Sequence, residues 1–255
     1  MQGKKRRLKR IMKNGRAIII PMDHGMTKPE NGLEDVDRIM AMLDGIADAF
    51  ILHKGMAKNS SMVEELESAL IIHLSASTYL SPDPLDKRVI TSVEKAIQLG
   101  ADAVSVHVNI GCERDIEQIR EASLISEKCD DYGIPLLVMA YPRGVGINEF
   151  GADEIKLAVR VANEIGADIV KTNYTGDAES FKDVLKFSKA PVVIAGGSKT
   201  DETSLLKTIE EAISAGAGGV AIGRNVFQSR NPRNLVLKIS EIVHGVIYER
   251  GMVNR

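Results

Sequence analysis

The sequence predicts a (β/α)₈ barrel, and three observations lead to that prediction. Short apolar segments alternate with helical patterns from one end of the chain to the other. These segments are apolar throughout, which is typical of parallel strands that are buried on both faces. Eight such strand–helix units in a chain of 255 residues match the size and rhythm of this barrel.

The expected strands are placed by the apolar segments, at residues 17–22, 49–52, 70–74, 103–108, 135–140, 168–171, 192–195 and 219–222. Helices are expected between them, for instance at residues 33–45, 92–99, 116–132, 154–165, 179–187 and 203–215. Several of these helices end at a glycine, such as Gly100 and Gly166, which suits a left-handed helix cap before the next strand.

Two parts of the chain are less determined by the pattern. Residues 75–91 fit either a long loop or an extra short strand, and Pro82 and Pro84 favour a loop. The basic start of the chain predicts a short amphipathic helix with Leu8, Ile11 and Met12 on one face, and a nucleic-acid-binding tail is the alternative.

A doubly wound open sheet is the alternative fold. It would be favoured by a glycine fingerprint after the first strand, but Asp23, His24 and Gly25 follow there instead. No serine- or glycine-rich linker and no change in composition divides the chain. We therefore expect one domain over residues 1–255.

The composition restricts the class of protein. The chain is 44% hydrophobic and 27% charged with a net charge of −2. This composition suits one large soluble domain with a well-buried core, or two small ones, and argues against a dedicated nucleic-acid surface. It has no run of about 18 apolar residues, so no membrane segment is expected, and the basic start lacks the apolar centre of a secretory signal. Cys112 and Cys129 fit no metal spacing and are interpreted as reduced thiols of a cytoplasmic protein.

In a barrel of this kind, reactive groups come from the C-terminal ends of the strands and from the loops that follow them. Residues of functional types lie at these positions in the expected strands: Asp23, His24, His53, Lys54, His73, Asn109, Tyr141, Arg143, Lys171, Gly196, Gly197, Gly223 and Arg224. This clustering predicts an active site on that rim.

Lys171 is the residue that most directly indicates a reaction. It is the only charge late in an apolar strand, and burial disfavours the ammonium form of lysine. A neutral amine there could attack a ketone or aldehyde to give a Schiff base, with Tyr141 moving a proton and Asp23 serving as a carboxylate base or binding a substrate hydroxyl. The alternatives are a lysine with its ammonium in solvent, a packing role for Tyr141 and a helix cap for Asp23.

Two ligand hypotheses follow from the remaining rim residues. The loops at 195–198 and 222–225 place backbone N–H groups and Arg224 near helix N-termini, where barrels often bind phosphate, and tight turns are the alternative. His53, His73 and His107 suggest a zinc site, but their spacing is neither HxH nor HExxH. We therefore expect no metal and no cofactor.

Five motifs in chain order resemble the archaeal class I aldolase family: PMDHG (21–25), YPRG (141–144), DIVKTNYTGD (168–177), VVIAGGSKT (192–200) and GVAIGRNVFQ (219–228). The resemblance covers nearly the whole chain. It implies a barrel with Lys171 as Schiff-base nucleophile, Tyr141 as proton donor and Asp23 as the acid–base carboxylate. It also implies assembly into rings, commonly decamers, and assigns substrate or phosphate binding to His24, Gly25, Met26, Thr27, Pro142, Arg143, Gly196, Gly197, Gly223 and Arg224.

The family has two main branches, and the chain is more similar to one of them. Bisphosphate aldolases of this family usually carry a tryptophan shortly before YPRG, where this chain has residues 138–140, VMA. PMDHG and LSPDPL (80–85) look more like the heptulosonate synthases, which join a three-carbon fragment of 6-deoxy-5-ketofructose 1-phosphate to L-aspartate semialdehyde in aromatic amino-acid synthesis. Fructose-1,6-bisphosphate aldolase is the alternative. A thiolase acting on a phosphorylated autoinducer and a non-catalytic phosphate-binding barrel stay open.

Overall fold

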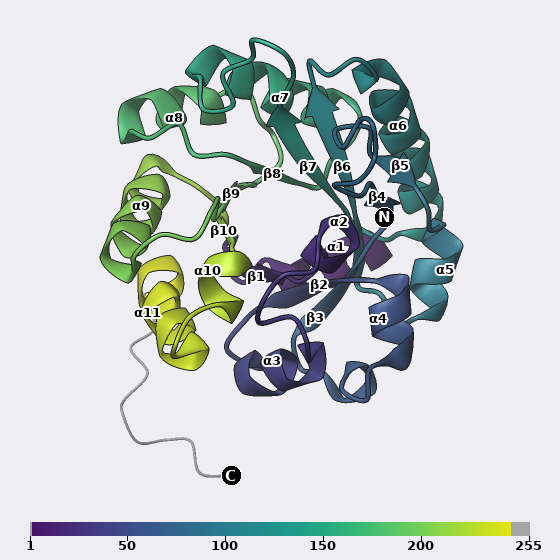
Figure 1. The fold of residues 1–255 in the computed structure, drawn as a ribbon, viewed down its shortest axis with the longest axis vertical. Helices are drawn as coiled ribbons and strands as arrows, with labels where there is room; N and C mark the ends of the chain where they lie inside the picture. Colours follow the sequence, from purple (N-terminus) through teal and green to yellow (C-terminus); the bar gives the residue numbers. More distant parts are fainter. Residues whose placement is uncertain (1, 246–255) are drawn as a thin grey trace.

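Eight parallel strands close into a barrel in the order β1-β10-β9-β8-β7-β6-β3-β2, and helices surround it (Figure 1). The computed structural model describes residues 2–245. The barrel strands are β1 (Ala17–Pro21), β2 (Ala49–His53), β3 (Ala69–His73), β6 (Ala103–Ile110), β7 (Leu136–Pro142), β8 (Ile169–Thr172), β9 (Val192–Ala195) and β10 (Gly219–Ala221). The expected barrel is confirmed, with strand ends that differ by one or two residues.

The helices of the chain are α1 (Gln2–Ile11), α2 (His24–Thr27), α3 (Val36–Leu43), α4 (Lys54–Asn59), η1 (Val63–Glu65), α5 (Val93–Gln98), α6 (Asp115–Tyr132), α7 (Ala152–Glu164), α8 (Ala178–Leu185), α9 (Glu202–Ala215), α10 (Arg224–Phe227) and α11 (Pro232–His244). The sequence pattern does not predict α2, α4 and α10, because four to six residues are too few to show an apolar period. Across residues 2–245, none of the helices combines the length and apolarity needed to cross a bilayer.

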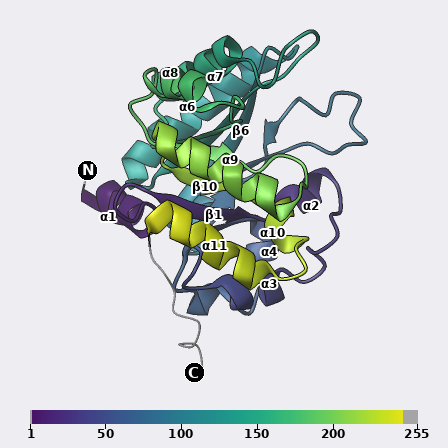
Figure 2. The same cartoon turned by 90° about the vertical axis from the view of Figure 1, so that its left-hand side faces the viewer.

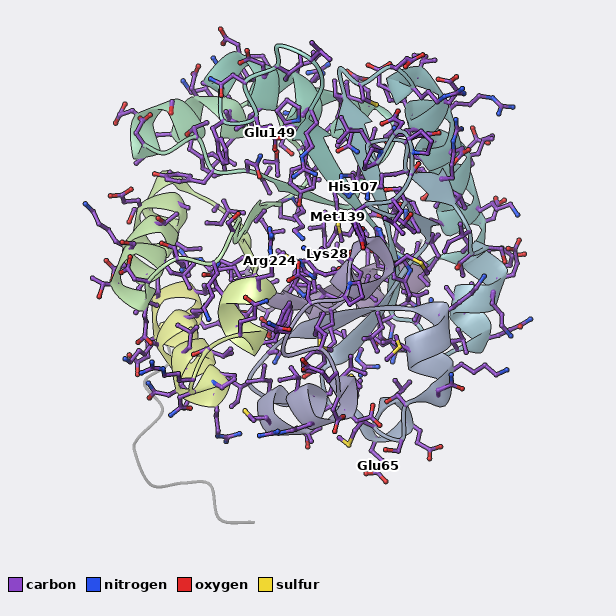
Figure 3. All side chains as sticks on the ribbon, in the orientation of Figure 1. Lys28, Glu65, His107, Met139, Glu149 and Arg224 are labelled. Carbon is purple, nitrogen blue, oxygen red and sulfur yellow. The ribbon has the colours of Figure 1, made fainter. Side chains whose placement is uncertain are left out.

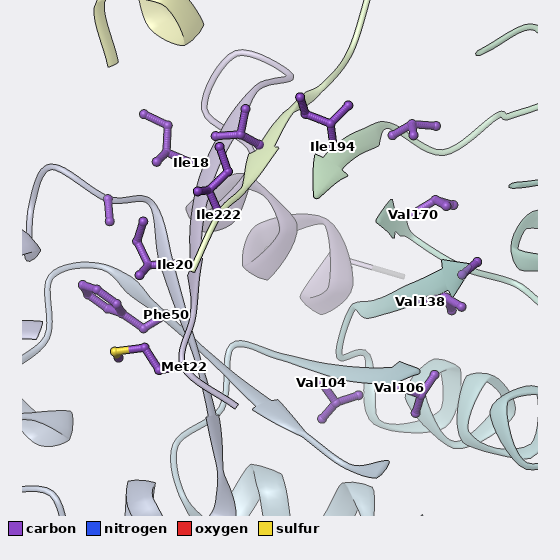
Figure 4. Close-up of a cluster of buried hydrophobic side chains, with 14 of the residues drawn as sticks. Ile18, Ile20, Met22, Phe50, Val104, Val106, Val138, Val170, Ile194 and Ile222 are labelled. Atoms are coloured by element: carbon purple, nitrogen blue, oxygen red, sulfur yellow. The ribbon is translucent and has the colours of Figure 1, made fainter. Parts of the chain in front are cut away.

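The strands are apolar on both faces because they serve two cores. Successive side chains in a strand point to opposite faces. In β1, Ile18 and Ile20 pack outward against the helices, where Figure 4 also shows Phe50 and Val138, while Ile19 lies in the cluster that fills the barrel. This arrangement explains why the sequence shows continuous apolar runs instead of alternation.

Helix α1 closes the N-terminal end of the barrel, at the opposite end from α2 and α10 (Figure 2). Ile11 is fully buried in the cluster inside the barrel, and Leu8 packs against the same cluster. Lys4 forms an ion pair of 2.9 Å with Asp168, and Arg10 forms one of 2.9 Å with Asp102. The predicted amphipathic helix is confirmed, and these two basic residues bind the barrel itself.

Residues 75–91 form a strap over the other end of the barrel. It contains a two-stranded antiparallel pair, β4 (Ser75–Ala76) and β5 (Arg88–Val89), so the plain loop that the prolines favour is only part of it. Pro82 and Pro84 lie in the turn that joins the two strands. The strap is fixed to the barrel because Asn109 Nδ2 and Gln118 Nε2 donate to the Leu85 carbonyl at 2.7 and 2.9 Å.

Candidate active site

A cavity of about 250 Å³ opens at the C-terminal ends of the barrel strands. In Figure 3, His107, Met139, Lys28 and Arg224 gather over the centre of the barrel, whereas Glu65 lies at its periphery. Ten of the predicted site residues line the cavity: Asp23, His24, Thr27, Tyr141, Arg143, Lys171, Gly196, Gly197, Gly223 and Arg224.

Three predicted binding residues do not line this cavity. Gly25 and Met26 are exposed residues of the short helix α2, and Pro142 is buried at the end of β7. Their places in the sequence motifs are explained by the turn that positions Asp23 and His24 and by the end of the strand that carries Tyr141.

Lys171 is buried at the wall of the cavity, with only 6% of its surface exposed. Its register partner on the neighbouring strand is Met139, and Nζ lies 3.9 Å from the Met139 sulfur. Within residues 2–245, no carboxylate forms an ion pair with it. The side chain therefore does not extend into bulk solvent, and its amine contacts a weakly interacting thioether.

The Tyr141 ring is held from two sides on β7, two residues after Met139 and on the same face of the strand. The ring centroid of His107 lies 5.0 Å away, and the Arg143 guanidinium carbon lies 4.5 Å from the ring centroid of Tyr141. Arg143 is oriented in turn by a 2.9 Å bond from Nε to Glu149. Tyr141 is thus both a packed residue and a wall of the cavity.

Asp23 occupies the N-cap position of α2, but its side chain makes no capping hydrogen bond. Its carboxylate faces two imidazoles instead, with Oδ2 3.9 Å from His73 Nε2 and Oδ1 3.9 Å from His24 Nδ1. Burial by itself raises the pKa of Asp23, but the neighbouring His73, His24 and Lys171 together bring this pKa below its ordinary value. An ionised carboxylate therefore lines the same cavity as Lys171.

The buried histidines are neutral and engaged by neighbours. Burial lowers the pKa of His73 to about 3, and its Nδ1 lies 2.8 Å from Ser105 Oγ. The His53 ring meets the His73 ring edge to face, with 5.2 Å between the ring centroids, whereas Nε2 of His107 is hydrogen-bonded to Asn109 Oδ1 at 2.8 Å. In the described part of the chain, no three potential ligand side chains are grouped to hold a metal ion. The metal-free reaction remains a prediction.

The two glycine loops after β9 and β10 are built so that only glycine fits. A Cβ at Gly196 would lie 2.7 Å from Ile222, and one at Gly223 would lie 2.5 Å from the Pro21 carbonyl. Among the described residues, the N–H groups of Gly196, Gly197 and Gly223 donate to no backbone carbonyl. Nε of Arg224 is buried and also lacks a partner.

Asn225 joins these two loops and was missed by reasoning from the sequence. Its Nδ2 donates to the carbonyls of Gly196 at 2.8 Å and Ser198 at 3.1 Å, and its Oδ1 accepts from the Thr200 N–H at 2.8 Å. Asn225 could have been noticed because it directly follows Arg224 in the sequence, but only the folded structure shows which groups it binds.

Other cavity residues were also missed: Lys28, Glu30, Lys87, Met139 and Asn173. Asn173 could have been found, because it follows Lys171 by two residues and so lies on the same side of the extended chain. Lys87 could not have been found in this way. It belongs to the strap, and no apolar pattern in the sequence predicts how the strap crosses the barrel.

Comparison with known proteins places the chain in a family. Residues 17–229 match the model of the DeoC/LacD family aldolases. This chain belongs to the DeoC/LacD aldolase family. It is therefore a class I aldolase-type enzyme, and the predicted family and fold are confirmed.

Relatives of this DeoC/LacD aldolase carry two related names. It is 55% identical to 2-amino-3,7-dideoxy-D-threo-hept-6-ulosonate synthase 1 of Archaeoglobus fulgidus, covering 96% of this chain and 92% of that protein. It is 39% identical to 2-amino-4,5-dihydroxy-6-oxo-7-(phosphonooxy)heptanoate synthase of Streptomyces griseus, covering 90% and 85%. Both names describe an amino acid with a seven-carbon chain.

Among solved structures, the aldolase resembles an archaeal fructose-1,6-bisphosphate aldolase whose catalytic lysine is covalently bound to the carbinolamine intermediate of its substrate. The TM-score is 0.88 and the identity 30%, covering 95% of this chain and 100% of that one. The structural likeness supports the same barrel, and the higher identity lies with the synthases.

Proposed function

We propose that this enzyme is a transaldolase that forms a Schiff base through Lys171 and makes 2-amino-3,7-dideoxy-D-threo-hept-6-ulosonate. It takes a three-carbon fragment from 6-deoxy-5-ketofructose 1-phosphate and joins it to L-aspartate semialdehyde, a step of aromatic amino-acid biosynthesis. The observation that carries the proposal is the Lys171 amine, buried in the cavity wall and free of any carboxylate partner within the described residues.

The reaction begins at the Lys171 nitrogen. Its lone pair attacks the ketone carbon of the donor to give a carbinolamine, which loses water to form a protonated imine. The imine nitrogen then accepts the electron pair of the carbon–carbon bond that breaks, so that an aldehyde leaves and an enamine stays on Lys171. The enamine carbon attacks the acceptor aldehyde, and water releases the product from the lysine.

Tyr141 and Asp23 carry the protons in this scheme. Cleavage requires that the hydroxyl of the departing fragment lose a proton, and addition requires that the acceptor oxygen gain one. Tyr141 lies on the strand next to Lys171 and lines the same cavity. The ionised carboxylate of Asp23 serves as the acid–base group for carbinolamine formation or binds a substrate hydroxyl.

The glycine loops and Arg224 bind the phosphate of the donor. Their bare N–H groups and the unpartnered Arg224 Nε provide donors for a dianion, and the crowding around Gly196 and Gly223 keeps these donors in place. His24 and Thr27 line the cavity nearby and complete the substrate-binding surface.

A transfer assay tests the proposal. Purified enzyme in EDTA is given 6-deoxy-5-ketofructose 1-phosphate and L-aspartate semialdehyde, and in a parallel reaction fructose 1,6-bisphosphate. We expect the seven-carbon amino acid by mass spectrometry and little cleavage of the bisphosphate. Cleavage of the bisphosphate alone would show a fructose-1,6-bisphosphate aldolase, and a requirement for coenzyme A would show a thiolase. Loss of activity in EDTA with recovery in zinc would show a metal aldolase.

We also propose that the enzyme works in the cytoplasm as a homo-oligomer, with the decamer that the family resemblance implies. Cys112 and Cys129 are both free and buried, as expected for a reducing compartment. Multi-angle light scattering of the purified protein measures the assembly, and a monomer at micromolar concentration would contradict the proposal.

A further inference from the structure

We propose that Lys87 binds the carboxylate of the aldehyde acceptor and thereby determines acceptor specificity. The inference rests on the proposed function and assigns a ligand group to a residue that lies outside the sequence motifs. It concerns the same cavity.

Lys87 is a buried cation that forms no ion pair with any side chain of residues 2–245. Its residue is 8% exposed, it lines the cavity, and Nζ donates only to Thr27 Oγ1 at a long 3.4 Å. Over residues 2–245, no carboxylate forms an ion pair with it. A buried charge left unpaired is costly, so an anion that arrives with the substrate would relieve that cost.

The acidic residues of the strap, and Glu121 of the neighbouring helix α6, are engaged elsewhere. Asp86 binds Arg88 at 2.7 Å, and Glu121 binds the same guanidinium at 3.2 Å. Asp83 accepts the Leu85 N–H at 2.9 Å. The protein therefore does not neutralise Lys87 with its own strap.

A second cation lies on the same side of the cavity. Burial and then the charge of Arg143 lower the pKa of Lys87, and the carboxylate of Asp23 raises it by less. The two positive groups therefore lie close enough to repel each other. Arg143 already has Glu149 as a partner, so Lys87 is the cation of this pair that needs an anion. Two neighbouring cations are stabilised when a negative group binds beside both.

The order of the strands places Lys87 where the acceptor should be. Lys171 lies in β8, with the β9 and β10 loops on one side and β7, β6 and β3 on the other. Arg224 follows β10, whereas Tyr141 is in β7 and the Lys87 strap follows β3. Because Tyr141 is proposed to exchange a proton with the aldehyde oxygen, the acceptor lies beside Tyr141, in the cavity that Lys87 also lines.

The strap also holds Lys87 firmly. Its anchors lie within two residues on either side, at the Leu85 carbonyl and at the Val89 N–H, which donates to Glu121 at 2.9 Å. A lysine fixed in this way loses little further freedom on binding a ligand, so it can contribute to specificity.

The test compares acceptors in the Lys87→Met enzyme at saturating donor. L-aspartate semialdehyde carries the carboxylate, whereas butanal has the same number of carbons and no charge. We expect the KM for L-aspartate semialdehyde to rise about 10- to 100-fold, the effect of losing one charge-assisted hydrogen bond. The value of kcat/KM for butanal should change by less than about twofold, and Lys87→Arg should recover part of the loss.

Lys54→Met is the matched control. Lys54 donates to the Ile90 carbonyl of the same strap at 2.6 Å but does not line the cavity. This variant removes a lysine of α4 that binds the strap without removing cavity charge, so its KM for L-aspartate semialdehyde should stay near that of the wild type. Equal losses in both variants would show a structural role and overturn the assignment.

The remaining outcomes are distinct. Wild-type enzyme that transfers nothing to L-aspartate semialdehyde refutes the proposed function. The wild-type enzyme could make the product while Lys87→Met leaves the KM for L-aspartate semialdehyde unchanged, or lowers kcat/KM for butanal by the same factor. Either result refutes only the role of Lys87.

Discussion

At the residue scale, binding of the phosphate and transfer of the proton are assigned to different side chains on opposite sides of Lys171. Arg224 and the glycine loops contribute charge-assisted hydrogen bonds of about 1.5–3 kcal/mol each to a phosphate. Arg224→Ala should therefore raise the KM for the phosphorylated donor about 10- to 100-fold. The apparent KM for L-aspartate semialdehyde should respond little. Steady-state kinetics checks this, and unchanged donor binding would place the phosphate elsewhere.

Tyr141→Phe should have the opposite effect on the kinetic constants, lowering kcat and leaving the donor KM nearly unchanged. The ring that packs between His107 and Arg143 is retained, and only the proton-transfer group is lost. Because that group acts mainly in the transition state, kcat should fall by about 10²- to 10⁴-fold while the donor KM changes little. A loss confined to KM would make Tyr141 a binding residue only.

Burial of His73 gives the fold a pH dependence whose direction can be stated. The pKa of His73 is lowered from an ordinary 6.5 to about 3, so the unfolded chain binds a proton there that the folded chain does not. Stability from this group is complete above about pH 6.5 and falls as the pH drops toward 3. Between pH 7.5 and pH 5 the loss should be about 2 kcal/mol.

Urea unfolding at the two pH values measures this difference. His73→Asn should reduce the loss by that amount relative to wild type, while the contributions of His24, His53 and His107, whose pKa values are also lowered, persist. An unchanged slope in the variant would mean that His73 is not a neutral buried group.

At the scale of single elements, α1 stabilises the barrel without contributing to the cavity. Ile11 is fully buried at the end of the barrel opposite to Lys171. Ile11→Ala should lower the free energy of unfolding by about 2–5 kcal/mol, while KM values at temperatures where the variant is folded should stay within about twofold. Leu8→Ala, at a partly buried position, should cost less. Denaturant titration and kinetics on the two variants check this, and a matching loss of substrate affinity would connect α1 to the active site.

Elements differed in how far their sequences predicted them. The strands and long helices were predictable because they bury apolar faces with a fixed period. The strap was not, because β4 and β5 have two residues each and depend on Asn109, Gln118 and Glu121, which are distant in sequence. Lys87 was missed for the same reason. Lys171 was singled out because it is the only charge late in an apolar strand.

At the scale of the whole molecule, the barrel brings the C-terminal ends of its eight parallel strands to one rim, so the rim could be predicted once the strands were placed. The distances within the site could not be predicted from the sequence. Lys171 contacts Met139, and His73 faces Asp23, because of the strand register, which the apolar pattern does not specify. Ten of the predicted site residues line the cavity, whereas Gly25, Met26 and Pro142 lie in the turn and at the strand end beside it.

The most direct test of the account is borohydride trapping on the whole enzyme. Incubation with the ketose phosphate donor followed by borohydride should add one fragment mass per chain, and peptide mapping should place it on Lys171. Lys171→Met should abolish the adduct while the fold stays the same. An adduct on Lys54, Lys87 or Lys199, or trapping that persists in Lys171→Met, would contradict the central claim that Lys171 is the nucleophile.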